Sequence, residues 1–261
     1  MDEFTDVNRF NDTIVPTADV VSLLTLIEYL SKQFYPILLA GPSGSGKTSL
    51  GSSIIDKLNY AAVKCVLTAQ TSSTQIRSVV DTKLERKRKG IYALNKSRPG
   101  IFYVDDAHMP AKEEYGAQPP LEVLRQLFED KGWYDITQGI FKKIVEMTTI
   151  VGCTTSGNLD LLPERLVHHL TLVSIPENTN EAFGQIFSVL LTPLARACGN
   201  AVASIIDNMV PATILLYRKL REQFKPTPAH MHYVFGPRDL SKIFQGLLLP
   251  LKNGQPKDPG F

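Results

Sequence analysis

Eight residues early in the chain have types and spacing that suit the binding of phosphate. Residues 41–48 read Gly-Pro-Ser-Gly-Ser-Gly-Lys-Thr, which fits the P-loop pattern G-x-x-x-x-G-K-[ST]. Glycines let the backbone turn tightly so that successive amides face an anion, and the positive end of a following helix adds to the attraction. In such a loop we expect Lys47 to reach the β- and γ-phosphates and the Thr48 hydroxyl to ligate Mg²⁺. The stretch therefore predicts a site for ATP or ADP.

The residues on either side supply the strand and the helix that the loop needs. Residues 37–40 are four apolar residues in a row, as in a buried strand. Residues 48–58 place their apolar side chains on one helical face. The residues that we assign to the predicted nucleotide site from this stretch are Gly41, Pro42, Ser43, Gly44, Ser45, Gly46, Lys47, Thr48 and Ser49.

Two adjacent carboxylates form the second part of the predicted site. Asp105 and Asp106 follow the bulky residues 101–104, whose lack of alternation predicts a strand buried on both faces. Asp105 lies 58 residues after Lys47 (105 − 47), and we expect it to act as a Walker B aspartate that holds Mg²⁺ and its waters. Asp106 occupies the place where a catalytic Glu would polarise the attacking water. Its side chain is shorter by about 1.5 Å, and displacements of that size cost ~10²-fold in rate, so we expect slow hydrolysis.

Polar residues at the end of the next strand are candidates for sensing the γ-phosphate. Thr155 is placed to hydrogen-bond the γ-phosphate or the water, with Thr154 and Ser156 as alternatives. A threonine that simply ends a strand is the other interpretation.

Two arginines are candidates for contacts with phosphate. Arg238 opens the last predicted helix, where a cation opposes the helix dipole, so its position suggests an anionic partner rather than an ordinary surface residue. Arg165 precedes the fifth predicted strand. It is either an arginine finger for a neighbouring site or the partner of Glu164 in an ion pair.

Composition limits the other classes of function. The chain has 261 residues, 43% of them hydrophobic, and a net charge of +2, which suits a folded core and gives no reason to expect nucleic acid. Cys65, Cys153 and Cys198 lie far apart without metal-binding spacing, as in an intracellular protein with reduced thiols. We find no signal peptide and no apolar run of about 18 residues that would span a bilayer, so no membrane contact is expected.

The periodicity of the chain changes near residue 176. Before it, strands and helices alternate, which predicts an α/β fold with a parallel five-stranded sheet sandwiched by helices. We expect the charged run Lys83–Lys89 to be the solvated end of a helix that begins at Ser73 and stops at Gly90. After residue 176 the pattern is helical, with one helix kinked or split at Pro211. The predicted domains are residues 1–176, which bind nucleotide, and residues 177–261, a small all-helical lid.

Beyond these patterns, several stretches resemble the third AAA+ module of a dynein heavy chain of the axonemal type. The most specific are Tyr103-Val104-Asp105-Asp106 with Met109-Pro110, residues 115–126, residues 132–135, and residues 226–246 around Arg238. The resemblance covers nearly the whole chain and implies an AAA+ P-loop NTPase fold with a lid. It implies that Arg238 belongs to the sensor II segment, and that residues 14–17, including Val15 and Pro16, pack on the adenine.

The same resemblance implies partners and a location. Adjacent AAA+ modules of the same heavy chain would be the direct partners, and microtubules would be reached through the whole motor. The location would be the cytoplasm and cytoskeleton, within the axoneme of a cilium or flagellum. The module would bind nucleotide to regulate motility.

The chain departs from the family pattern at three places. Residues 155–158 replace a glycine- and proline-rich run, which puts the identity of the γ-phosphate sensor in doubt. His168-His169 replaces an Arg-His pair and bears on the arginine finger, and Gly236-Pro237 replaces Asn-Leu and bears on the lid angle.

Three functions are compatible with these features. The first is a regulatory ATP-binding module with slow hydrolysis, and the second is a non-hydrolysing scaffold that holds ADP. The third, a stand-alone P-loop kinase or NTPase, is opposed by the helical lid with Arg238. We expect the chain to be a fragment, because a single ring module would lack its neighbour's arginine and the polar residues 252–261 resemble a cut linker.

Overall fold

The computed structural model describes residues 10, 13–136, 138–155, 162–198 and 200–249, without the side chains of residues 196–204. The chain divides into two compact units, Ser22–Pro176 and Glu177–Phe261, and the segment Met1–Val21 groups with the second. The predicted boundary at residue 176 coincides with this division, whereas residues 1–21 were expected in the first unit. Each unit is described by itself.

The first unit is built on a parallel sheet of five strands in the order β2-β5-β8-β1-β9. Strand β1 lies between β8 and the edge strand β9, so the loop that follows it opens at the sheet's carboxyl edge beside the end of β8. All residues of β1 and β5 are buried, as their unbroken apolar runs predict for strands covered on both faces. The bounds are β1 Ile37–Gly41, β2 Ala61–Val66, β5 Gly100–Asp105, β8 Met147–Thr154 and β9 Thr171–Ser174.

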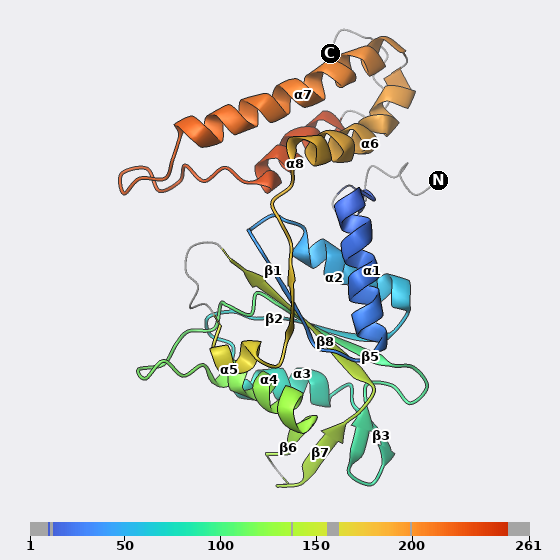
Figure 1. Ribbon diagram of the computed structural model, residues 1–261, viewed down its shortest axis with the longest axis vertical. Helices are drawn as coiled ribbons and strands as arrows, with labels where there is room; N and C mark the ends of the chain where they lie inside the picture. Colours follow the sequence, from blue (N-terminus) through green and yellow to red (C-terminus); the bar gives the residue numbers. More distant parts are fainter. Residues whose placement is uncertain (1–9, 11–12, 137, 156–161, 199, 250–261) are drawn as a thin grey trace. The chain divides into compact units, whose positions relative to one another are not determined.

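Helices cover both faces of this sheet (Figure 1). Phe102 and Val104 of β5 pack in one apolar cluster with α3, α4 and α5, while Tyr103 points to the opposite face and meets α2. Helix α1 lies on the α2 side, where Glu28 of α1 pairs with Lys57 of α2 at 2.6 Å. The bounds are α1 Ala18–Lys32, α2 Lys47–Leu58, α3 Ser73–Asp81, α4 Pro119–Asp130 and α5 Glu164–Val167. The predicted sandwich is confirmed.

A second sheet replaces part of a predicted helix. Helix α3 begins at a capping box of Ser72 and Gln75 but ends at Asp81, so the prediction of a helix through Lys89 is wrong. Gly90, with φ 76°, turns a hairpin in which Arg88 pairs with Ile91, whereas the prediction read this glycine as a helix stop. The strands, in the order β3-β4-β7-β6, are β3 Glu85–Arg88, β4 Ile91–Ala93, β7 Phe141–Ile144 and β6 Gly132–Tyr134.

The second unit is helical and has its own core. Helices α6 (Asn180–Cys198), α7 (Asn200–Gln223) and α8 (Pro237–Leu247) bury an apolar cluster that also includes Phe10 from the N-terminal segment. Pro211 lies inside α7 and does not split it. None of the helices described is long and apolar enough to cross a membrane. The predicted tail at residues 252–261 lies outside the described residues.

Candidate nucleotide-binding site

The P-loop has the backbone conformation that an anion cradle requires. Gly44 and Gly46 have φ values of 80° and 91°, in the left-handed region that glycine adopts without strain. Gly41, at the end of β1, leaves no room for a side chain, because a Cβ there would lie 2.6 Å from the carbonyl oxygen of Ile175. The glycines of the motif therefore serve the turns and the close packing that the sequence predicted.

Two polar features of this loop suit an anionic ligand. Helix α2 begins at Lys47, and no side chain caps its first amides. The hydroxyl of Ser45 is buried and has no hydrogen-bond partner in the part of the chain that the structure describes. Uncapped helix amides and an unpaired buried hydroxyl cost free energy unless a ligand satisfies them, and a helix N-terminus favours an anion. The residues present therefore fit a bound phosphate chain.

The side chain of Lys47 lies across the loop. It is only 7% exposed, and its Nζ donates to the carbonyl oxygens of Gly41 at 2.9 Å and Pro42 at 2.7 Å. The Gly41 carbonyl also accepts from the amide of Thr155 at 3.1 Å, which brings the end of β8 beside the loop. Lys47 thus holds a positive charge at the mouth of the amide cradle.

Thr48 and Asp105 meet at the carboxyl edge of the sheet. The Thr48 hydroxyl donates to Asp105 Oδ2 at 2.7 Å, and the Asp105 carboxylate is 6% exposed. A Cβ on Gly152 would lie 2.7 Å from Asp105 Oδ1, so the glycine of β8 makes room for the carboxylate. Two adjacent oxygen donors suit Mg²⁺, which takes few protein ligands and completes its shell with phosphates and waters. Accordingly, no group of three or more His, Cys, Asp or Glu residues gathers into a metal cage within the described ranges.

Asp106 stands in an unusual conformation beside this pair. Its φ is 53°, and its amide donates to Asp105 Oδ1 at 3.1 Å. Both Asp106 and Lys47 act electrostatically on the buried thiol of Cys153, whose pKa is raised to about 11, mainly by burial. Asp106 follows β5 directly and Lys47 follows the loop after β1, so both belong to the carboxyl edge of the sheet.

One residue of this region was missed by sequence reasoning. Tyr103 is buried on the α2 face, and its hydroxyl donates to the carbonyl oxygen of Lys47 at 3.5 Å. Burial raises the pKa of this hydroxyl, and the negative charge of Asp105 raises it further. A glycine inside a helix, Gly51, was the available signal, since such a residue often marks the close approach of a neighbour.

Among the other predicted site residues of this unit, Thr155 lies beside the P-loop through the bond from its amide to Gly41. Thr155 is exposed, Thr154 is half-buried, and Ser156 lies outside the described residues, as do the departures at 157 and 158. Arg165 is exposed on α5 and makes no ion pair with Glu164 within the described chain.

The remaining predicted residues belong to the second unit. Arg238 is exposed in the first turn of α8, Val15 is buried, and Pro16 is exposed. Their roles toward the nucleotide stay predictions.

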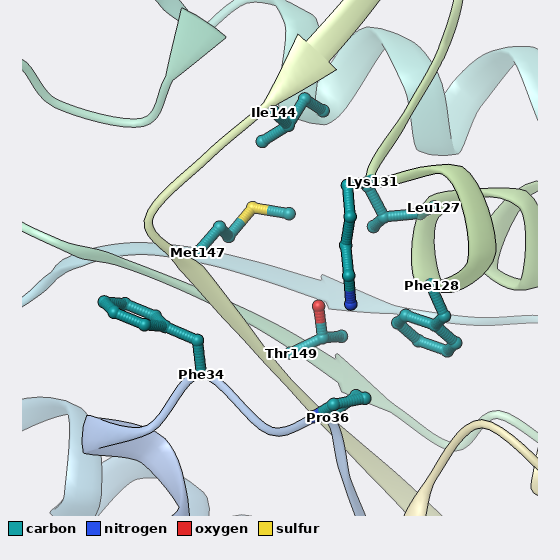
Figure 2. A pocket seen from close by; sticks show the side chains of 8 residues that line it. All are labelled: Phe34, Pro36, Leu127, Phe128, Lys131, Ile144, Met147 and Thr149. Carbon is teal, nitrogen blue, oxygen red and sulfur yellow. The ribbon is translucent and has the colours of Figure 1, made fainter.

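A small cavity lies at the opposite, amino edge of the parallel strands (Figure 2). It measures about 30 Å³, roughly the share of one water molecule in the liquid, and is too small for a nucleotide. Lys131 extends into it toward Thr149, while Phe34 and Pro36 line it just before β1. The cavity is separate from the P-loop, which follows β1 at the other end of the strand.

Comparison with known proteins agrees with this geometry. Residues 3–178 match the family described as P-loop containing dynein motor region, and residues 188–259 match the dynein heavy chain ATPase lid domain. The chain is 36% identical to dynein axonemal heavy chain 1 of Homo sapiens over 261 residues, which cover 94% of this chain and 6% of that protein. It is 34% identical to dynein axonemal heavy chain 6 of Homo sapiens over 244 residues, again 6% of that protein. The chain thus spans about 6% of the length of these relatives, and it belongs to the dynein heavy chain family, in which it corresponds to a P-loop motor region followed by its lid.

Proposed function

We propose that this chain is a nucleotide-binding AAA+ module, the third in the motor ring of an axonemal dynein heavy chain. The observation that carries the proposal is the cradle itself, in which an uncapped helix start and the unpaired Ser45 hydroxyl lie beside the paired Thr48 and Asp105. The similarity to axonemal heavy chains supports the assignment to a cilium or flagellum. Adjacent modules of the same heavy chain are the proposed partners, and microtubules are reached through the complete motor.

In this proposal, different residues of the site bind the phosphates, the metal ion and the adenine. The P-loop amides and Lys47 hold the phosphates, while Thr48 and Asp105 hold Mg²⁺. Mg²⁺, when bound, neutralises charge on the β- and γ-phosphate oxygens. Asp106 polarises the attacking water, and Thr155 senses the γ-phosphate. Val15 and Pro16 pack on the adenine in this proposal.

Regulation is proposed to act through the lid and through hydrolysis that is slow in the isolated chain. Arg238 would distinguish ATP from ADP, and Arg165 would serve the site of a neighbouring module as a finger in trans. Loss of such a finger costs ~10³–10⁵ in the rate of GTPases, so a chain without its neighbour should turn over slowly.

The second candidate function is a ring module that holds ADP without hydrolysis. One observation favours it. Asp106 combines a short side chain with a left-handed backbone, which changes the direction of the carboxylate relative to an extended residue. A stand-alone P-loop enzyme is not favoured, because the lid match covers most of the second unit.

The experiment that tests the proposal is a calorimetric titration of ADP into the chain, together with chromatography of any nucleotide that copurifies. Lys47→Ala should weaken ADP binding by about 10- to 100-fold, because hydrogen bonds to charged groups contribute ~1.5–3 kcal/mol. Lys143→Ala, which removes an exposed lysine from the second sheet, is the matched control and should bind as the wild type does. Equal affinities for wild type and Lys47→Ala would contradict the proposed site.

A further inference from the structure

Tyr103 occupies a position between the phosphate-binding helix and the strand that carries Asp105. Its side chain is 3% exposed and lies on the face of β5 that α2 covers. Its hydroxyl donates to the carbonyl oxygen of Lys47, in the first turn of α2, at 3.5 Å. The hydroxyl and the carboxylate of Asp105 both lie beside Gly152 of the neighbouring strand β8.

Glycines on both sides of the tyrosine make this placement possible. A Cβ on Gly51 of α2 would lie 2.3 Å from Tyr103 Cε2, a distance that real Cβ atoms do not reach. A Cβ on Gly152 of β8 would lie 3.5 Å from the Tyr103 hydroxyl oxygen and 2.7 Å from Asp105 Oδ1. Helix α2 and strand β8 thus each have a glycine, without a side chain, where Tyr103 and Asp105 pack against them.

We propose that the Tyr103 hydroxyl is a positioning group for the magnesium site, holding the first turn of α2 against β5 so that Thr48 faces Asp105. The inference deepens the proposed nucleotide-binding function and rests on it. Tyr103 touches neither phosphate nor cation in this role. It acts through the two residues that do.

The chemistry of the position favours a role for the hydroxyl beyond packing. A phenylalanine would fill the same space under Gly51 without burying an oxygen, and a buried hydroxyl without partners costs free energy. The hydrogen-bond acceptor of Tyr103 is the carbonyl of Lys47, the residue directly before Thr48. Loss of the hydroxyl should therefore loosen the Thr48–Asp105 pair, while the P-loop amides and the Lys47 ammonium still bind phosphate without the cation.

The test compares ADP affinity in EDTA with ADP affinity in excess Mg²⁺, by calorimetry on the full chain. For Tyr103→Phe we expect the enhancement by Mg²⁺ to fall about 3- to 10-fold, the effect of one neutral hydrogen bond, with the affinity in EDTA unchanged within about 2-fold. Tyr92→Phe, a half-buried tyrosine of the second sheet, is the matched control and should keep the full enhancement. Thermal unfolding in EDTA checks that all variants are folded.

A double-mutant cycle with Asp105→Asn gives a second measurement. If Tyr103 acts through Asp105, then Tyr103→Phe should lower the Mg²⁺ enhancement in the wild-type background and change it little in Asp105→Asn. An enhancement equal to wild type in Tyr103→Phe would overturn the inference and leave the proposed function intact. An equal loss of affinity in EDTA and in Mg²⁺ would also overturn it, since the hydroxyl would then serve the fold alone. Failure of the wild-type chain to bind ADP would instead remove the proposed function and the inference with it.

Discussion

At the scale of single residues, we propose that Asp106 determines whether the site hydrolyses ATP or only holds nucleotide. Aspartate and asparagine adopt the left-handed conformation more readily than other side chains, so φ of 53° is tolerated here. The amide of Ala107 donates to the carbonyl of Gly152 at 2.9 Å, which fixes the chain directly after the turn. The position of the Asp106 carboxylate is therefore set by the backbone and by its short side chain together.

Asp106→Asn separates chemistry from binding at this position. Asparagine keeps the size and the backbone preference of aspartate but has no basic carboxylate, so ATP hydrolysis should fall by at least ~10²-fold while ADP affinity stays within about 2-fold. Phosphate release over long incubations and ADP calorimetry measure the two quantities. Asp106→Ala is the control for strain and should lower the melting temperature, whereas Asp106→Asn should not. Hydrolysis that persists in Asp106→Asn would exclude this residue as the base.

The sequence was most informative about the residues that we propose to bind the nucleotide, and less so about the residues that support them. The spacing of Lys47, Thr48 and Asp105 predicted one site, and the structure places the last two in contact. Sequence reasoning did not identify Tyr103 as a site residue, because an aromatic residue in a buried strand is ordinarily part of the hydrophobic core. Its close contact with Gly51 of α2 appears only in the structure and supports the positioning role that we propose for it.

At the scale of elements, the parallel strands were predictable and the second sheet was not. Strands β1 and β5 of the large sheet are unbroken runs of buried, mostly apolar residues, which composition alone is enough to predict. The strands β3 and β6 have four and three residues and carry charged or mixed side chains. Trp133 of β6 donates to Asp81 Oδ1 at 3.1 Å, and Lys142 of β7 donates to Asp81 Oδ2 at 3.1 Å. These long-range hydrogen bonds connect the second sheet to the end of α3. They join residues far apart in the sequence, so no local sequence pattern predicts them.

Glycines inside helices give a prediction at this scale. Replacing glycine by alanine in a helix interior normally stabilises a protein by about 0.5–1 kcal/mol. Gly51→Ala should instead destabilise the chain and weaken Mg²⁺-dependent ADP binding, because its Cβ would collide with the buried Tyr103 ring. Gly184→Ala in α6 is the matched control, since a Cβ there meets nothing within 4 Å. Urea unfolding of both variants measures the difference, and a gain of stability in Gly51→Ala would contradict the packing.

At the scale of the whole molecule, the chain forms two units, each with its own hydrophobic core. The sheet unit has an apolar cluster that packs α3, α4 and α5 against its strands. The lid unit has a separate cluster, in which the rings of Phe187 and Phe244 stack with their centroids 4.3 Å apart. Phe10 is buried in the lid's cluster, although its place in the sequence precedes the sheet unit. The lid is therefore completed by a segment that sequence order alone assigns elsewhere, which is why the domain prediction put residues 1–21 in the first unit.

Two separately packed units allow nucleotide to act on their relative orientation. A nucleotide changes such an equilibrium only by binding one orientation more tightly than another. We propose that Arg238 supplies the difference by a charge-assisted contact with the γ-phosphate, which ADP lacks. A contact of ~1.5–3 kcal/mol would shift a two-state equilibrium by about 10- to 100-fold. The start of α8, the helix that carries Arg238, is well defined. Pro237 fixes the backbone of its first turn, and the Gly236 amide donates to Asp239 Oδ2 at 3.0 Å.

The measurement is the distance between labels at the exposed positions Lys89 and Glu222, one in each unit. In the wild type we expect different distance distributions with ADP and with a non-hydrolysable ATP analogue. Arg238→Ala should make the two distributions alike, while Lys242→Ala, which removes another exposed cation from α8, should preserve the difference. Identical distributions in the wild type would mean that nucleotide does not switch the lid. The module would then act as a static part of the ring, and the scaffold function with bound ADP would become the better account of the chain.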